Sequence, residues 1–239
     1  MIARERLGNL ERVVLSRPER RNALTPAMLD ELASSIERAS EANALLLLGE
    51  GKVFCAGFDL ELCIGNDGDT NLRRLLEGLS RCIAAMRALP CPVVVGVQGA
   101  AIAGGCALLG GGDVVIAHPQ AKLGYPVTRL GISPAVSAPF IAAPPGQARR
   151  LLLDPGLIDG TRAHAIGLAH ELHDEPAAHA MTVAESLAAK PTHALAATKR
   201  WLNECSPTDG TRGLKTSRSL VGNEESRRLL AAALEKTRT

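Results

Sequence analysis

Aromatic residues are scarce in this sequence, which has three Phe, one Tyr and one Trp among 239 residues. Because aromatic side chains bury the most apolar area each, the core is predicted to consist mainly of Ala, Leu, Val and Ile. The scarcity also argues against a stacking platform for single-stranded nucleic acid. The net charge is only +2 and the basic pairs are scattered, so no basic stripe points to a nucleic-acid partner.

Cysteine pairs with metal-binding or redox spacing are also lacking. The six cysteines form no C-x-x-C pair and no metal-like spacing with histidine, so we predict reduced thiols and no metal site. The first residues, MIARERLGNLERVVL, are charged and lack the apolar centre of a signal peptide. No uninterrupted apolar run reaches membrane-spanning length. We therefore expect a cytoplasmic protein with no membrane partner.

What is present is an alternation of apolar strands and amphipathic helices. A helix is predicted over 25–40, with Thr25 as its N-cap and Pro26 at its first position, and another over 72–90. A turn is expected at 99–103, and a helix starting near Gly104 follows it. Strands are predicted at 10–18, 44–50, 91–99 and 113–117.

This alternation favours an α/β fold with parallel strand pairing. Beyond Gly131 the pattern is mostly helical. We therefore predict an α/β body over about 1–175 and a helical region over about 176–239. Since that region shows no core of its own, it is expected to pack on the body or on a neighbouring subunit.

Two glycine-containing segments follow apolar strands: FCAGFDL at 54–60 and AGGCA at 103–107. Glycine allows the backbone to turn sharply and a ligand to approach closely. If each segment offered one free N–H, the two could bind a single carbonyl oxygen as an oxyanion hole. Close packing of a helix on a strand explains the same glycines, and both interpretations stay open on the glycines alone.

Taken in order, four blocks of sequence resemble the enoyl-CoA hydratase/isomerase (crotonase) family. The blocks are LSRPERRNALTPAMLDEL (15–32), GKVFCAGFDL (51–60), CPVVVGVQGAAIAGGCALLGGGDVVIA (91–117) and AKLGYPVTRLGISPAVSAPFI (121–141), followed in register by DGTRAHAIGLAHEL (159–172). The resemblance implies a spiral of ββα turns with a C-terminal helical trimerisation region. It also implies a homotrimer or dimer of trimers, and a coenzyme A thioester as substrate without a further cofactor.

The same resemblance implies which residues form the site. The two oxyanion amides would belong to Phe58 and Gly104. The segments 21–24 and 56–60 would line the coenzyme A channel. The expected substrate-binding residues are Asn22, Ala23, Ala56, Asp59, Leu60, Gly105, Ala107, Tyr125 and Val127.

The chain departs from the family pattern at both catalytic glutamates. Ala107 stands three residues after Gly104, where family hydratases carry the first glutamate, and Val127 follows Pro126 in place of the second. Hydration of an enoyl thioester needs a base for water and an acid for the α-carbon, and neither side chain supplies them. Ordinary hydration is therefore not expected.

Acids near the first segment are candidate substitutes. Asp59 either takes part in the chemistry or bonds to nearby backbone, and the backbone role is favoured. Glu61 either faces the acyl pocket or is a charge at a helix start, and the helix-start role is favoured. Asp67 and Asp69 have the character of turn residues.

Other candidates lie in the third and fourth blocks. Tyr125 either serves the site or fills core volume with its hydroxyl satisfied, and Arg129 pairs either with a substrate carboxylate or with an internal acid. Cys106 is interpreted as a buried residue that fills core volume rather than as a nucleophile. His118 is interpreted as the end of a strand rather than as a proton-transfer group.

These residues favour an acyl-CoA enzyme that relies on an oxyanion hole. Decarboxylation suits it because a departing carboxylate leaves an enolate without any base to start the reaction. The alternative, from a different class, is a crotonase homologue that binds acyl-CoA without turnover.

Overall fold

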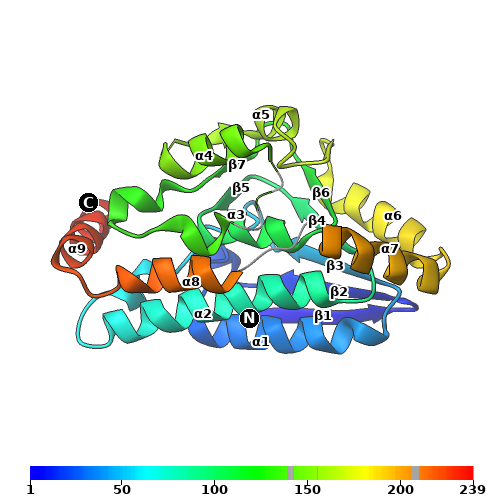
Figure 1. The fold of residues 1–239 in the computed structure, drawn as a ribbon, viewed down its shortest axis with the longest axis horizontal. Helices are drawn as coiled ribbons and strands as arrows, with labels where there is room; N and C mark the ends of the chain where they lie inside the picture. The colour runs from blue at the N-terminus through cyan, green and yellow to red at the C-terminus, as the bar shows by residue number, and fades with distance from the viewer. Residues whose placement is uncertain (139–140, 142, 155, 206–209, 239) are drawn as a thin grey trace.

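A computed structural model describes residues 1–138, 141, 143–154, 156–205 and 210–238. Its central element is a six-stranded sheet in the order β1-β2-β3-β4-β6-β9 (Figure 1). The β1–β2 pair is antiparallel and the other neighbours are parallel. The strands are β1 (Ile2–Leu7), β2 (Leu10–Leu15), β3 (Ala44–Gly49), β4 (Val93–Val97), β6 (Val114–Ala117) and β9 (Glu171–Leu172).

A second sheet of three short strands, in the order β5-β7-β8, lies beside the first. Its members are β5 (Ala100–Ile102), β7 (Lys122–Gly124) and β8 (Ile158–Asp159). The helices are α1 (Pro26–Arg38), α2 (Gly68–Ala88), α3 (Gly104–Leu108), α4 (Pro145–Leu153), α5 (Gly160–Ala165), α6 (Pro176–Ala188), α7 (Thr192–Cys205), α8 (Gly210–Ser219) and α9 (Glu224–Arg238). Short 3-10 turns include η1 (Pro18–Arg20), η3 (Leu60–Cys63), η5 (Pro126–Leu130) and η6 (Pro134–Val136).

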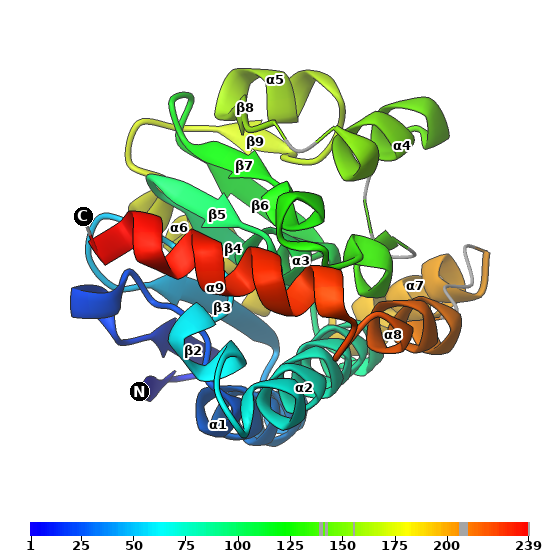
Figure 2. The same ribbon diagram turned by 90° about the vertical axis from the view of Figure 1, so that its left-hand side faces the viewer.

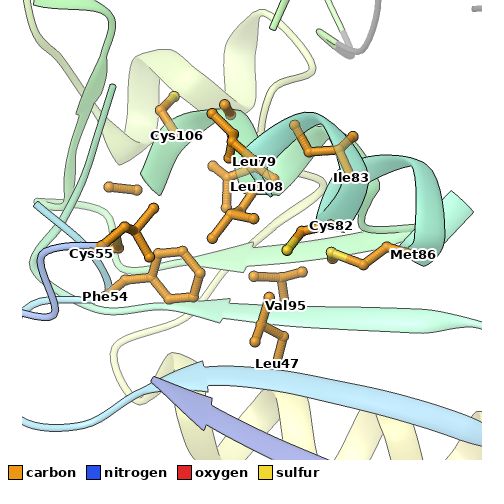
Figure 3. Packing of buried hydrophobic residues seen from close by; sticks show 14 of the residues in the cluster. Leu47, Phe54, Cys55, Leu79, Cys82, Ile83, Met86, Val95, Cys106 and Leu108 are labelled. Atoms are coloured by element: carbon orange, nitrogen blue, oxygen red, sulfur yellow. The ribbon is translucent and has the colours of Figure 1, made fainter. Parts of the chain in front are cut away.

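The central strands of the large sheet, β3 and β4, are buried on both faces. Alternate β3 residues divide between two cores: Leu45 and Leu47 face the α1 and α2 side, whereas Leu46 and Leu48 pack with Ala184 and its neighbours on α6. Figure 3 shows β3, β4, α2 and α3 contributing side chains to the first core. Aliphatic side chains and cysteine thiols supply nearly all of this packing, as the scarcity of aromatics predicts.

Most of the predicted elements appear close to their expected positions. The side chain of Thr25 accepts a hydrogen bond from the Met28 amide at 3.1 Å, and α1 starts at Pro26. Two expectations need correction, because the predicted turn at 99–103 contains β5, and β8 and β9 lie in the segment expected to be helical. These strands have only two or three residues, which is too short for a periodicity to show.

The C-terminal region begins by packing on the body, since α6 covers one face of the large sheet. Farther along, α9 crosses the face of the molecule that is turned toward the viewer in Figure 2, and it contacts η3 and η5. The division at about residue 175 stays a prediction. Within the described residues, no helix combines the length and apolar character needed to cross a membrane.

Candidate functional site

The two glycine segments meet in the structure. Gly57 has a φ of +93°, and a Cβ placed on it would lie 2.9 Å from the Ile102 carbonyl oxygen and 3.6 Å from the Gly104 nitrogen. A Cβ on Gly104 would in turn lie 3.0 Å from the Phe58 ring. A side chain at position 57 would displace the backbone of the second loop, so the glycine allows the two loops to approach this closely.

Backbone pairing fixes the direction of the first loop. Leu24 donates its amide hydrogen to the Gly57 carbonyl at 2.7 Å, and Asp59 donates to the Leu24 carbonyl at 2.9 Å. Because successive peptide groups alternate in direction along an extended strand, the amide of Phe58 points away from Leu24. Among the described residues, the Phe58 amide donates no hydrogen bond.

The second loop also ends in an uncommitted amide. Ala103 donates to the Gly124 carbonyl at 2.8 Å, which fixes the turn before α3 to the end of β7. Gly104 is the first residue of α3, and the first amides of a helix have no partner within it. Within the described part of the chain, the Gly104 amide has no acceptor.

Phe58 and Gly104 line one cavity of about 150 Å³. None of its described lining residues is charged, and its polar side chains are Tyr125, Ser133 and Ser137. Residues from the first loop, α2, the α3 turn, η5 and η6 form its walls: Ala56, Phe58, Leu60, Leu76, Leu79, Ile102, Ala103, Gly104, Tyr125, Pro126, Val127, Leu130, Ile132, Ser133, Pro134, Val136 and Ser137.

The two positions that lack the family glutamates differ in their surroundings. Val127 lines the cavity on η5. Ala107 is 1% exposed on α3 and is absent from the lining, as is Gly105, whose missing Cβ leaves room for the Cys55 carbonyl oxygen. The cavity therefore receives no carboxylate from either position.

A second cavity, of about 330 Å³, shares Ala56, Phe58 and Leu60 with the first. Its polar part comes from η1 and η3, and its described lining residues are Glu19, Arg20, Arg21, Ala23, Ala56, Phe58, Asp59, Leu60, Glu61 and Leu234. It is wide and charged where the first cavity is small and apolar. The two together offer one space for a polar group and one for an apolar group.

Asp59 and Glu61, which line the second cavity, are both paired with arginines. The buried carboxylate of Asp59 accepts a hydrogen bond from Arg17 at 2.8 Å and from the Glu61 amide at 3.3 Å. Glu61 pairs with Arg20, and this pairing raises the pKa of the Arg20 guanidinium. Neither acid lines the apolar cavity, so the favoured interpretations of both fit these contacts.

Asn22 supports the first loop through its side chain. It is fully buried with a φ of +54°, and its amide nitrogen donates to the carbonyls of Glu50, Val53 and Phe54. Its side-chain oxygen accepts from the Arg17 amide at 2.9 Å. Asn22 lines neither cavity, and its predicted substrate contact stays a prediction.

The remaining candidates lie outside the apolar cavity. The carboxylate of Asp69 pairs with Arg227 of α9, whose hydrogen bond lowers the pKa of Asp69. His118 accepts a hydrogen bond from the Gln120 amide through Nδ1 at 3.1 Å and so stabilises the turn after β6. Asp67 and Arg129 are also absent from the lining, as is Thr128, the residue between Val127 and Arg129.

Tyr125 is the exception, because it lines the cavity with a buried side chain. Its hydroxyl lies near the Ser137 hydroxyl and the Cys106 thiol, and both groups influence its pKa. Burial raises its pKa well above the ordinary value, and burial likewise raises the pKa of Cys106 to about 12. Ser137 was not singled out from the sequence, where no motif marks it.

Among the described residues, no group of three or more His, Cys, Asp or Glu side chains is placed to hold a metal ion. The site is thus a pair of uncommitted amides beside an apolar cavity, with a charged cavity adjoining it.

Comparisons with known proteins agree with this architecture. The family model described as enoyl-CoA hydratase/isomerase matches residues 5–232. A Mycobacterium tuberculosis protein described as a probable enoyl-CoA hydratase is 33% identical over 196 residues, covering 78% of this chain and 75% of the relative. The 1,2-epoxyphenylacetyl-CoA isomerase of Escherichia coli is 32% identical over 205 residues, covering 80% of this chain and 77% of that protein. A crystal structure of an enoyl-CoA hydratase/isomerase from Xanthobacter autotrophicus Py2 superposes with a TM-score of 0.87 at 26% identity, covering 98% of this chain and 93% of that one. The chain therefore belongs to the enoyl-CoA hydratase/isomerase family and has the crotonase fold.

Proposed function

We propose that this protein is an acyl-CoA enzyme that stabilises a thioester enolate between the Phe58 and Gly104 amides and that its reaction is of the decarboxylase type. The observation that carries the proposal is the pairing of two uncommitted amides with a cavity whose described lining residues are all uncharged. Family membership supports the acyl-CoA substrate.

The apolar cavity supports decarboxylation in particular. Moving an unpaired carboxylate from water into such surroundings costs several kcal/mol or more. Loss of carbon dioxide removes that charge from the cavity and transfers it to the thioester oxygen, where two amides can receive it. Preorganised donors of this kind stabilise a developing oxyanion and need no proton transfer to begin the step.

The size of the cavity limits the acyl group. A protein cavity of about 150 Å³ holds a molecule the size of benzene. We therefore expect a short, apolar acyl substituent in the space of about 150 Å³ next to Phe58 and Gly104, with the coenzyme A portion in the charged cavity.

A direct assay compares two probes. Decarboxylation of 2-methylmalonyl-CoA is expected, and hydration of crotonyl-CoA is expected to be absent or slow because none of the described lining residues carries a carboxylate. Hydration at an ordinary enzyme rate, with no release of carbon dioxide, would refute the proposal.

The oxyanion role has its own test at Gly57. Gly57→Ala places a Cβ 2.9 Å from the Ile102 carbonyl oxygen and so displaces the Phe58 amide. Loss of one oxyanion donor lowers kcat by roughly 10²–10³-fold. Gly65→Ala is the matched control, since Gly65 has a φ of +75° but no atom within 4 Å of its Cβ position. Equal turnover in the two variants would contradict the assignment.

A second candidate function is acyl-CoA binding without turnover. The replacement of both glutamates by Ala107 and Val127 favours it. Calorimetry with a panel of CoA thioesters separates the candidates, because tight binding with no product from any thioester supports the binder.

A further inference from the structure

We propose that the hydroxyl of Tyr125 is the proton donor that converts the enolate into the product thioester, with Ser137 positioning that hydroxyl. This inference rests on the proposed enolate-forming function and deepens it. It assigns the step that the oxyanion amides cannot perform, because a backbone amide stabilises negative charge but does not protonate carbon.

The composition of the cavity leads to Tyr125. Among its described lining residues, Tyr125 has the one titratable side chain. The positions of the family carboxylates hold Ala107, which is outside the lining, and Val127, which has no proton to give. A proton supplied by a side chain inside the cavity must therefore pass through a hydroxyl.

The backbone holds Tyr125 at a fixed position relative to the oxyanion turn. The carbonyl of Gly124, the preceding residue, accepts the Ala103 amide at 2.8 Å, and Gly104 comes directly after Ala103. Tyr125 and Gly104 are thus each one residue from the same hydrogen bond. Both residues line the same cavity, so a thioester whose oxygen is bound at Gly104 would share that space with the Tyr125 side chain.

The contacts of the hydroxyl suit proton delivery. Tyr125 is 2% exposed, and Ser137, which also lines the cavity, and the Cys106 thiol are near enough to its hydroxyl to influence its pKa. Ser137 belongs to the segment after η6, so a second element of the cavity wall holds the tyrosine. Burial keeps the phenol protonated at neutral pH, because it raises the pKa of Tyr125 well above its ordinary value.

The step balances as follows. The C–CO₂⁻ bond breaks, carbon dioxide leaves, and the electron pair forms the enolate. The enolate α-carbon then forms a C–H bond with the hydroxyl proton of Tyr125, leaving a tyrosinate. After product release, a water molecule returns a proton to the tyrosinate through the Ser137 hydroxyl and leaves as hydroxide.

The test follows the stereochemistry of protonation. In D₂O, decarboxylation of 2-methylmalonyl-CoA introduces deuterium at C2 of propionyl-CoA. A proton donor fixed in the cavity wall delivers it to one face, so the wild-type protein is expected to give one enantiomer. Tyr125→Phe is expected to slow product formation by roughly 10²–10⁴-fold and to give a racemic product, since solvent then protonates either face.

Two further variants separate this role from packing. Ser137→Ala keeps the phenol and is expected to slow turnover while the product stays a single enantiomer. Thr128→Val removes an exposed hydroxyl from η5, which starts directly after Tyr125. Thr128 is outside the cavity lining, so this variant is expected to match the wild type in rate and product. Thermal unfolding of each variant reports whether the fold is retained.

The possible failures are distinguishable. If folded Tyr125→Phe retains both the rate and the single enantiomer, the proton-donor assignment is refuted while the proposed function stands. If the wild-type protein binds the thioester and releases no carbon dioxide, the proposed function is refuted and the assignment with it.

Discussion

Ala103 has a backbone conformation that glycine adopts more easily, and replacing it should stabilise the protein. It has a φ of 52° and a ψ of −112° at the position before α3. A non-glycine residue held in such a region costs roughly 1–3 kcal/mol. Ala103→Gly removes that strain, whereas the greater freedom of glycine in the unfolded chain costs roughly 0.4–1 kcal/mol.

The two effects together predict a gain of about 1 kcal/mol in the free energy of unfolding. Little packing opposes it, because one partly exposed methyl group is lost at Ala103. For a chain of this size, 1 kcal/mol raises Tm by roughly 2–4 °C. Differential scanning calorimetry of wild type and variant under identical conditions measures that shift.

Ala101→Gly provides the matched control. Ala101 lies two residues earlier in β5, is fully buried and has no positive φ, so its replacement is expected to lower Tm. The opposite signs at two alanines of one segment distinguish backbone strain from a general effect of glycine. A Tm for Ala103→Gly at or below that of the wild type would refute the strain argument.

Further predictions concern stability and thiol chemistry. Lys199 donates to Asp113 at 2.7 Å and to two backbone carbonyls, so Lys199→Met should lower the free energy of unfolding in urea by about 2 kcal/mol. The loss is below that of a fully buried pair because the Asp113 side chain is 35% exposed, and an unchanged midpoint would contradict it. Cys205 is the exposed thiol among six cysteines, so a thiol reagent at pH 8 should modify one residue in the native protein and six after denaturation. Burial raises the pKa of Cys55 and Cys106 from 9.0 to about 12. At pH values between 9 and 12 the native state therefore binds more protons than the unfolded chain. Native stability should therefore be retained below pH 9 and fall as the pH rises from 9 toward 12, which denaturation curves at several pH values would check.

The strands and helices that the sequence predicts well are those with a local physical signal. The Thr25 cap and the following proline mark the start of α1, and β3 is an uninterrupted apolar run. β1 was not predicted, because five of its six residues are exposed and charges dominate it. Its pairing with β2 brings Arg4 and Arg6 to the fully buried Glu11, a compensation that only the paired structure reveals.

The residues of the candidate site also differ in whether the sequence contains a signal that marks them. Phe58 and Gly104 can be assigned from sequence through the family resemblance, because the nearby glycines alone leave close packing open as an alternative, and the structure places both residues on one cavity. Ser137 has no such signal, since its contact with Tyr125 depends on the path of η5 and η6 around the cavity. Leu76 and Leu79, which also line the cavity, carry the ordinary pattern of a core-facing helix.

The composition of the cavity bears on which reactions can follow enolate formation. Hydration requires an activated water next to the β-carbon, and the wall residues that the structure describes supply neither a carboxylate or histidine base nor a charged group to hold that water. The same walls limit the access of solvent protons to an enolate, so its lifetime depends on a donor that is already in place. Loss of the Tyr125 hydroxyl should consequently affect the protonation of the enolate more than the binding of the thioester, which the Phe58 and Gly104 amides and the charged cavity would retain.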